Sequence, residues 1–275
     1  MKAFRLSSVL ALCAIAALNA CGTGQVDSIS DDDIIGGYGN NSAKYDAVGT
    51  VGALDASGAY SFFCTATLIS PTEVLTAKHC IVETDSTSPF YFQKYVNLIP
   101  IYFAVGADAN HPTQLVQAIA ADYATPNENG FVGLGSDMGV YHLIAPVQNV
   151  KPLKIATADL KDQSATTSTD HGDLAKKFSA MGYGVQDQLG SVGTKKIGQL
   201  TLNALSGLVY EKMFGSLDGF AAYLKTVYGE QLIDDNMDIV TDWYNTTSFL
   251  QGYDAYLGNQ PGDVQTCFGD SGGPL

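Results

Sequence analysis

Near the end of the sequence, one serine lies between glycines in the segment Gly269–Pro274, which reads GDSGGP. Glycines on both sides of Ser271 let the backbone turn tightly, so the N–H groups of Gly269 and Ser271 can point at one spot. Two such donors can hold the negative oxygen that develops on a carbonyl under nucleophilic attack. The segment therefore predicts a serine nucleophile and an oxyanion hole made by Gly269 and Ser271.

Two residues earlier in the chain can complete this chemistry. His79 lies in TAKHC, Thr76–Cys80, and Asp137 precedes a segment that alternates like a half-buried strand. A histidine can take the serine's proton as a general base, and a carboxylate can fix the tautomer of its ring. Each segment alone also has a structural interpretation, as a surface turn, a structural histidine or a cap. Their joint occurrence in one order favours catalysis.

These segments resemble motifs of the chymotrypsin-like serine protease family, in which TAKHC corresponds to Thr-Ala-Ala-His-Cys. The order His79, Asp137, Ser271 is also that of this family. Subtilisin has the order Asp, His, Ser, and the α/β-hydrolases have Ser, Asp, His. The resemblance implies a serine-type endopeptidase with His79, Asp137 and Ser271 as catalytic residues, no cofactor, and protein or peptide substrates.

The resemblance also implies a disulfide and a pocket residue. The strand Phe63–Ser70 resembles the family strand whose cysteine bridges to the one beside the histidine, which implies a Cys64–Cys80 disulfide. Trypsin-like members carry an Asp six residues before the catalytic serine, where this chain has Gln265. A neutral pocket floor cannot pair with a buried cation, so we expect no strict preference for Lys or Arg.

A possible activation site lies at Ile34–Gly37, IIGG, which resembles the new N-terminus that forms when zymogens of the family are cut. In the family, the freed amine pairs with the Asp before the catalytic serine, here Asp270, and this pair orders the oxyanion hole. Residues 21–33, directly before Ile34, contain no Lys or Arg. We therefore expect an activating protease that cuts after Asp33 and is not trypsin-like.

The leader, residues 1–20, has the pattern of a signal peptide, with a basic start and an apolar stretch too short to span a bilayer. Leu18–Cys21 resembles a bacterial lipobox, which predicts lipidation of Cys21; the alternative is cleavage after Ala20 with a free thiol. Residues 21–33 then form a polar tether. We expect a protein of the bacterial cell envelope, held to the membrane only by its lipid, or a secreted form after activation.

Composition indicates an all-β protein. The chain has 275 residues, 29 glycines and 46% hydrophobic residues, with alternating apolar stretches at 97–105 and 196–202. The resemblance implies two six-stranded antiparallel Greek-key barrels in a peptidase domain at 34–275, with the first barrel at 34–144. The linker and second barrel occupy 145–275. We expect strands at 49–54, 61–69 and 73–77, and an inserted amphipathic helix within 205–240.

The charge balance excludes one class of partner and the sequence offers no good metal site. With 28 acidic and 14 basic residues, the formal charge of −14 repels a phosphate backbone, so we expect no nucleic-acid partner. The cluster Asp234, Asn236 and Asp238 begins like a calcium loop, but the Gly and Glu that such a loop needs are missing. We therefore predict no metal. The other three histidines have no matched partners, and we expect surface or structural positions for them; they are His111, His142 and His171.

The sequence stops four residues after Ser271, and Cys267 has no partner. In the family, the matching cysteine pairs with one in the later strands that form the walls of the specificity pocket. We therefore expect an incomplete sequence with a truncated second barrel, because missing strands expose open edges. The alternative is a catalytically silent homologue that keeps the fold as a binding module in the cell envelope.

Overall fold

The computed structural model describes residues 37–39, 42–84, 87–124, 137–157, 159–161, 172–187, 190–250, 252–266 and 268–275. They form two compact units. The larger unit holds the described parts of 20–156, 178–200 and 261–275, and the smaller unit holds those of 157–177 and 201–260. No helix in these described ranges is long and apolar enough to cross a membrane.

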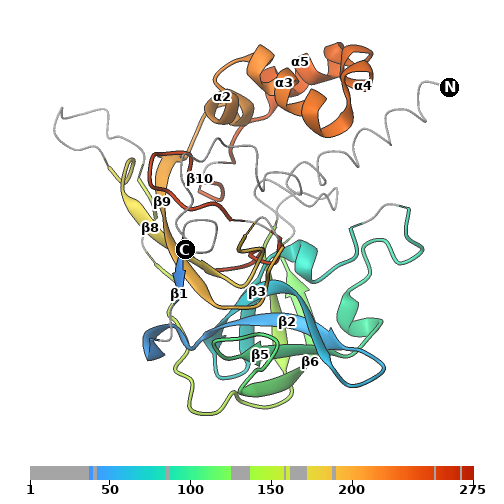
Figure 1. Ribbon diagram of the computed structural model, residues 1–275, viewed down its shortest axis with the longest axis vertical. Coiled ribbons are helices and arrows are strands. Elements are labelled where there is room, and N and C mark those ends of the chain that lie inside the picture. The colour runs from blue at the N-terminus through green and yellow to red at the C-terminus, as the bar shows by residue number, and fades with distance from the viewer. Residues whose placement is uncertain are drawn as a thin grey trace. The chain divides into compact units, whose positions relative to one another are not determined.

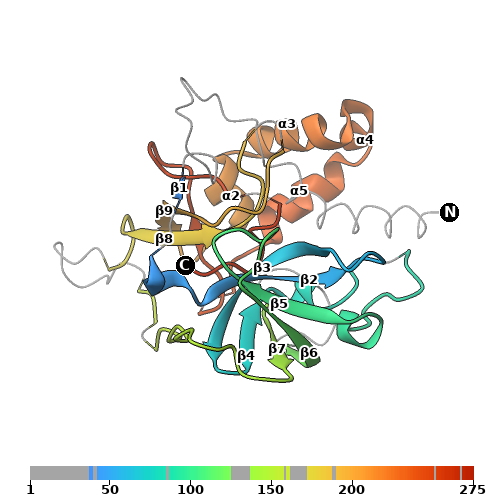
Figure 2. The same cartoon turned by 60° about the horizontal axis from the view of Figure 1, so that its bottom comes forward.

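Six antiparallel strands of the larger unit close into a barrel in the order β2-β3-β4-β7-β6-β5. The strands are β2 (Val48–Leu54), β3 (Tyr60–Ser70), β4 (Glu73–Thr76), β5 (Ile101–Val105), β6 (Gln114–Tyr123) and β7 (Gly139–Leu143). Figure 1 labels β2, β3, β5 and β6, and Figure 2 labels all six. This closed barrel confirms the predicted all-β fold class.

Alternating side chains fill the barrel. In β4 and β7, every second residue is buried, because successive side chains of a strand point to opposite faces. The inward-facing Val74 and Tyr141 are both fully buried in the barrel core. The hydroxyl of Tyr141 donates to the carbonyl of Cys80 at 2.7 Å, so the core also fixes the turn after β4.

The strands predicted at 49–54, 61–69 and 73–77 match β2, β3 and β4 closely. Strand β5 occupies only the second part of the alternating apolar stretch 97–105: it begins at Ile101, after the 3₁₀ helix η3 (Tyr95–Asn97). Pro100 lies directly before β5 and has no N–H to donate to a strand ladder. Two further 3₁₀ helices are η1 (Ala43–Tyr45) and η2 (Lys78–Cys80).

The second half of the fold is a four-stranded sheet built around β9 (Lys196–Ala204). This strand pairs with β1 (Tyr38–Gly39), β8 (Lys177–Gly182) and β10 (Tyr256–Leu257). Within the described ranges the sheet does not close into a second barrel.

The smaller unit contains four helices, which end at Thr246, where a single inserted helix within 205–240 was predicted. Its helices are α2 (Val209–Phe214), α3 (Leu217–Tyr228), α4 (Glu230–Asp234) and α5 (Met237–Thr246), drawn together in orange in Figure 1. Ser216 caps α3 by accepting a hydrogen bond from the N–H of Gly219 at 3.1 Å. Phe220 and Leu224, one turn apart on α3, are buried against Val240 of α5.

Candidate active site

His79 and Asp137 meet because β4 pairs with β7. Thr76 at the end of β4 lies opposite Gly139 at the start of β7. The chain that continues from β4 therefore lies beside the chain that enters β7. His79 Nδ1 is 2.7 Å from Asp137 Oδ2, and the backbone N–H of His79 donates to Oδ1 at 2.9 Å.

This double contact defines the protonation state of the pair. Burial raises the pKa of Asp137, but the hydrogen bond and charge of His79 lower it, and the pKa lies below the ordinary value. Asp137 is therefore an anion at neutral pH and can only accept hydrogen bonds. A neutral His79 ring then carries its proton on Nδ1 and a free electron pair on Nε2.

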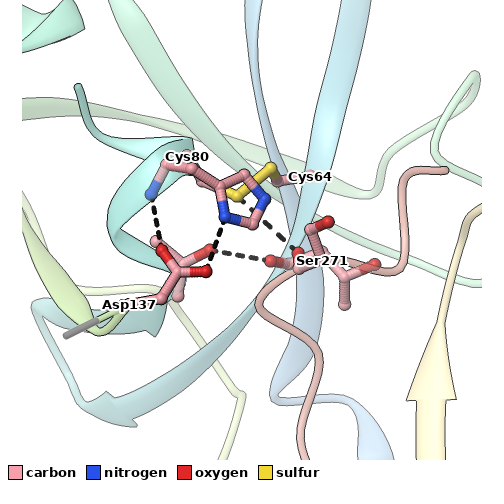
Figure 3. Close-up of polar contacts among 7 residues, drawn as sticks. Cys64, Cys80, Asp137 and Ser271 are labelled. Carbon is pink, nitrogen blue, oxygen red and sulfur yellow. Dashed lines mark hydrogen bonds and ion pairs between the residues drawn. A yellow bond between two sulfur atoms is a disulfide. The ribbon is translucent and has the colours of Figure 1, made fainter. Parts of the chain in front are cut away.

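The predicted Cys64–Cys80 disulfide is present, with an S–S distance of 1.98 Å and a Cα–Cα distance of 6.2 Å. It joins β3 to η2, so the turn that carries His79 is fixed to the barrel wall. Figure 3 shows the disulfide with Asp137 and Ser271 around it. Cys64, His79 and Cys80 form a compact group of potential metal ligands among the described residues, but the disulfide uses both sulfurs. This group therefore offers no thiolate to a metal.

The loop of Ser271 is held against β3 by main-chain contacts. The N–H of Thr65 donates to the carbonyl of Ser271 at 3.0 Å, and the Thr65 hydroxyl donates to the carbonyl of Gly269 at 2.7 Å. Cys80 Sγ lies 3.8 Å from the Ser271 carbonyl oxygen. One residue of β3 thus places the serine loop beside the disulfide and the turn of His79.

Ser271 has a free hydroxyl and free backbone donors around it. Among the described residues, no acceptor takes the N–H of Gly269 or of Ser271, and Ser271 Oγ makes no hydrogen bond. His79 Nε2 is also without a hydrogen bond in the part of the chain that the structure describes. Groups that must meet a substrate need to be unoccupied, and catalytic hydrogen bonds commonly tighten only when substrate binds.

The tight turn depends on glycine at two positions. Gly269 has φ +93° and Gly272 has φ +79°, in the left-handed region that other residues rarely adopt. A Cβ on Gly269 would lie 2.9 Å from Gly184 Cα, and one on Gly272 would lie 2.6 Å from the carbonyl oxygen of Thr65. Backbone on both sides therefore leaves no room for a side chain.

Asp270 is buried and accepts a hydrogen bond from the backbone of Gly184. It is only 8% exposed, and its Oδ1 accepts a hydrogen bond from the N–H of Gly184 at 2.8 Å. Gly184 belongs to the segment Gly182–Gly184, where a Cβ at either glycine would collide with the Asp270 carboxyl group. The predicted partner of Asp270, Ile34, lies outside the described residues, as do Cys21 and Cys267.

Gln265 is half-buried, and the N–H of its neighbour Val264 donates to the carbonyl of Gln199 on β9 at 3.0 Å.

The acidic cluster Asp234, Asn236 and Asp238 lies at the junction of two helices. Asp234 ends α4 and binds Lys225 Nζ at 2.6 Å. Asp238 lies in the first turn of α5.

The expectation that the remaining histidines lack partners is wrong for two of them. His111 Nδ1 lies 2.8 Å from Asp108 Oδ2, and His142 Nε2 lies 3.1 Å from Asp122 Oδ2. His111 follows its Asp by three residues in one turn, and His142 pairs across β6 and β7, so the first partner was visible in the spacing. His171 lies outside the described residues.

The sequence analysis assigned no role to Lys78 or Thr65. Lys78 is fully buried beside His79, and Thr65 binds both carbonyls of the serine loop. A signal for Lys78 was present, since it stands where the motif of the resembled family has Ala. Thr65 carries no local signal, because its nearer partner in the chain, Gly269, is 204 residues away.

A sequence model described as trypsin matches residues 35–207, and no curated protein matches the chain. Among solved structures, the chain is similar to one described as "Structure of GrC", at 18% identity and a TM-score of 0.41, covering 65% of this chain and 69% of that one. It is also similar to human heparin binding protein, at 15% identity and a TM-score of 0.41, covering 62% and 66%. A mutant of that human protein matches at 15% identity and a TM-score of 0.40, covering 61% and 64%. Because the trypsin match covers more than half of the sequence, this chain belongs to the trypsin family of serine proteases.

Proposed function

We propose that this chain is a serine endopeptidase in which Ser271, His79 and Asp137 hydrolyse peptide bonds through an acyl-enzyme. The observation that carries the proposal is the pair of hydrogen bonds from His79 to Asp137, at 2.7 and 2.9 Å, beside a serine loop with free donors. The family membership supports protein or peptide substrates.

In the proposed reaction, Ser271 Oγ attacks the peptide carbonyl and His79 Nε2 takes its proton. The tetrahedral intermediate then collapses as His79 returns this proton to the leaving amine. Water repeats the cycle on the ester, with His79 again as the base. Asp137 stays ionised throughout and holds the imidazolium that forms at each step.

The N–H groups of Gly269 and Ser271 are proposed to hold the developing oxyanion. Their freedom from other acceptors among the described residues supports this role. One oxyanion donor is commonly worth about 3 kcal/mol of transition-state stabilisation. The carbonyl contacts of Thr65 fix the loop on its other side, so the two N–H groups are held while the loop is empty.

Activation is proposed to occur by cleavage after Asp33, which frees the amine of Ile34 to pair with Asp270. Support comes from the sequence IIGG and from the burial of Asp270, which directly precedes Ser271. Lipidation of Cys21 and a place in the cell envelope are part of the same proposal, and the cut would separate the domain from its anchor. At the specificity pocket, Gln265 favours substrates other than those with Lys or Arg at the cleaved bond.

A fluorophosphonate probe tests the nucleophile in the complete, activated protein. We expect labelling of the native protein and of the control Ser191→Ala, whose serine is exposed and remote in sequence from the loop. Ser271→Ala should not be labelled. Equal labelling of the native and Ser271→Ala proteins would refute the assignment, and no labelling of any of the three would favour a silent homologue.

A further inference from the structure

Lys78, the residue before His79, is a fully buried lysine. Among the described residues its ammonium has no hydrogen-bond acceptor. Nζ instead lies 4.8 Å from the ring centre of Tyr123 and 5.4 Å from that of Phe92. Two aromatic faces therefore hold the cation, an arrangement that attracts an ammonium through the negative face of each ring.

Packing alone gives no reason for a charge at this place. Lysine is almost never fully buried unless it is paired, because the loss of water around the ammonium costs free energy. A methionine would fill the same space and pack well against Tyr123 and Phe92. Burying Lys78 therefore costs free energy of unfolding relative to an apolar residue. What distinguishes Lys78 from an apolar residue is the electric field of its ammonium.

The charged group that acts on Lys78 is Asp137 of the candidate active site. Burial lowers the pKa of Lys78, and the negative charge of Asp137 raises it, with a net value below that of an ordinary lysine. The pKa of Asp137 is lowered in turn by its contacts with His79 and with the backbone N–H of Lys78. One carboxylate thus interacts with two basic side chains, His79 and Lys78.

The neighbouring charges do not duplicate this effect. Lys94 Nζ lies 5.6 Å from the ring centre of Tyr123, but it is paired with Asp122 Oδ1 at 3.2 Å. Asp122 also contacts His142 at 3.1 Å. Among the described residues, further ionisable groups on the elements around Lys78 include Glu73, Glu83, Tyr91, Tyr95 and Tyr141.

We propose that the buried ammonium of Lys78 opposes protonation of His79, so that His79 remains a free base, and the enzyme active, at lower pH than without Lys78. The inference rests on the proposed function, since it concerns the base of that site. A buried positive charge disfavours a second positive charge on the neighbouring residue, because the low-dielectric interior screens the repulsion between them only weakly. Lys78 is a positioning residue: it touches no substrate and acts on His79 through its charge.

The test compares the native protein with Lys78→Met and with the matched control Lys94→Met. We expect the acidic limb of the pH profile of kcat/KM to move to higher pH by about half to one unit in Lys78→Met. It should stay in place in Lys94→Met, because Asp122 balances that charge. Lys78→Met should unfold at an equal or higher temperature, whereas a purely structural role for Lys78 would lower it.

A second measurement does not depend on activity. In the Ser271→Ala background, NMR can follow the ring of His79, one of only four histidines, as the pH is lowered. We expect protonation of this ring at higher pH in Lys78→Met, by the same half to one unit. An unchanged midpoint would overturn the inference even if the native enzyme is active. An inactive native enzyme with a shifted midpoint would overturn the proposed function alone.

Should Lys78→Met fail to fold, the lysine itself can be observed. Labelling with ¹³C and ¹⁵N at the ends of the lysine side chains reports whether Nζ of Lys78 is an ammonium or an amine. We expect an ammonium between pH 5 and 7, a range about 3 units or more below the ordinary lysine value. A neutral amine there would overturn the inference, because an uncharged group cannot oppose the protonation of His79.

Discussion

Replacing Asp137 by Asn tests the geometry of the His79–Asp137 pair. The two oxygens of Asp137 have different partners: Oδ1 accepts from the backbone N–H of His79 at 2.9 Å, and Oδ2 faces Nδ1 at 2.7 Å. Asn offers one oxygen and one NH₂ group. If the oxygen keeps the backbone contact, the NH₂ group faces Nδ1, which must then accept a hydrogen bond.

This change reverses the tautomer of the ring. With Nδ1 as an acceptor, the proton of a neutral His79 moves to Nε2, which can no longer take a proton from Ser271. The opposite amide orientation sets NH₂ against the backbone N–H, so neither arrangement is free of cost. We expect kcat for a peptide substrate to fall about 10⁴-fold, or about 5 kcal/mol of lost transition-state stabilisation, with KM little changed.

A matched control is Asp108→Asn, because Asp108 contacts His111 with the same atoms at 2.8 Å on the exposed surface. Steady-state kinetics of both variants should show the large loss only for Asp137→Asn. A loss below tenfold at Asp137, or similar losses at both positions, would refute the argument from the tautomer.

Asp137 should also contribute to stability in a pH-dependent way. Its pKa is lowered in the folded protein, so the contribution is present above the unfolded value of about 3.9 and is lost as the pH falls through the folded value. In urea unfolding, the stability gap between native protein and Asp137→Asn should therefore shrink below about pH 4. A gap that widens in acid would contradict the ionised state of Asp137.

Three further changes address the scaffold. Loss of the Cys64–Cys80 bridge, which closes a separation of 16 residues, should cost about 3 kcal/mol in urea unfolding of a Cys64→Ala/Cys80→Ala variant relative to the oxidised protein. Gly272→Ala should cost at least about 2 kcal/mol and abolish fluorophosphonate labelling, because its φ of +79° and the close Thr65 carbonyl exclude a side chain. Tyr183→Phe should cost about 1 to 2 kcal/mol by thermal unfolding, since it removes the buried hydroxyl that donates at 2.9 Å to a β2 carbonyl. If one of these variants unfolds with the same free energy as the native protein, the contact that it removes does not stabilise the fold.

The spacing of apolar residues along the chain predicted individual strands and the helical insertion, because these elements depend mainly on neighbouring residues. Burial alternates in β4 and β7, whereas β2 and β3 each contain five consecutive buried residues. Helix α3 follows from Phe220 and Leu224, which lie one turn apart, and from the cap at Ser216. The disulfide came from resemblance, since spacing alone does not fix a pairing. Within the alternating stretch 97–105, β5 begins only after Pro100, because periodicity alone does not register a missing backbone donor.

The sequence pattern could not predict the buried environment of Lys78. A lysine beside a histidine is expected at the surface, and only the three-dimensional packing of Phe92 and Tyr123 reveals its aromatic surroundings. The roles of His79, Asp137 and Ser271 stay predictions, although the structure brings the first two into contact.

The hydroxyl of Thr65 has consequences for the order in which function emerges during synthesis. Thr65 leaves the ribosome 204 residues before its acceptor, the carbonyl of Gly269. At ordinary translation rates this interval is about 10 to 40 s. During that time the barrel that carries His79 can fold, but Ser271, the proposed nucleophile, has not yet been synthesised. Under the proposed function, a nascent chain gains activity only after the segment that contains Ser271 docks on β3, which limits self-digestion during synthesis.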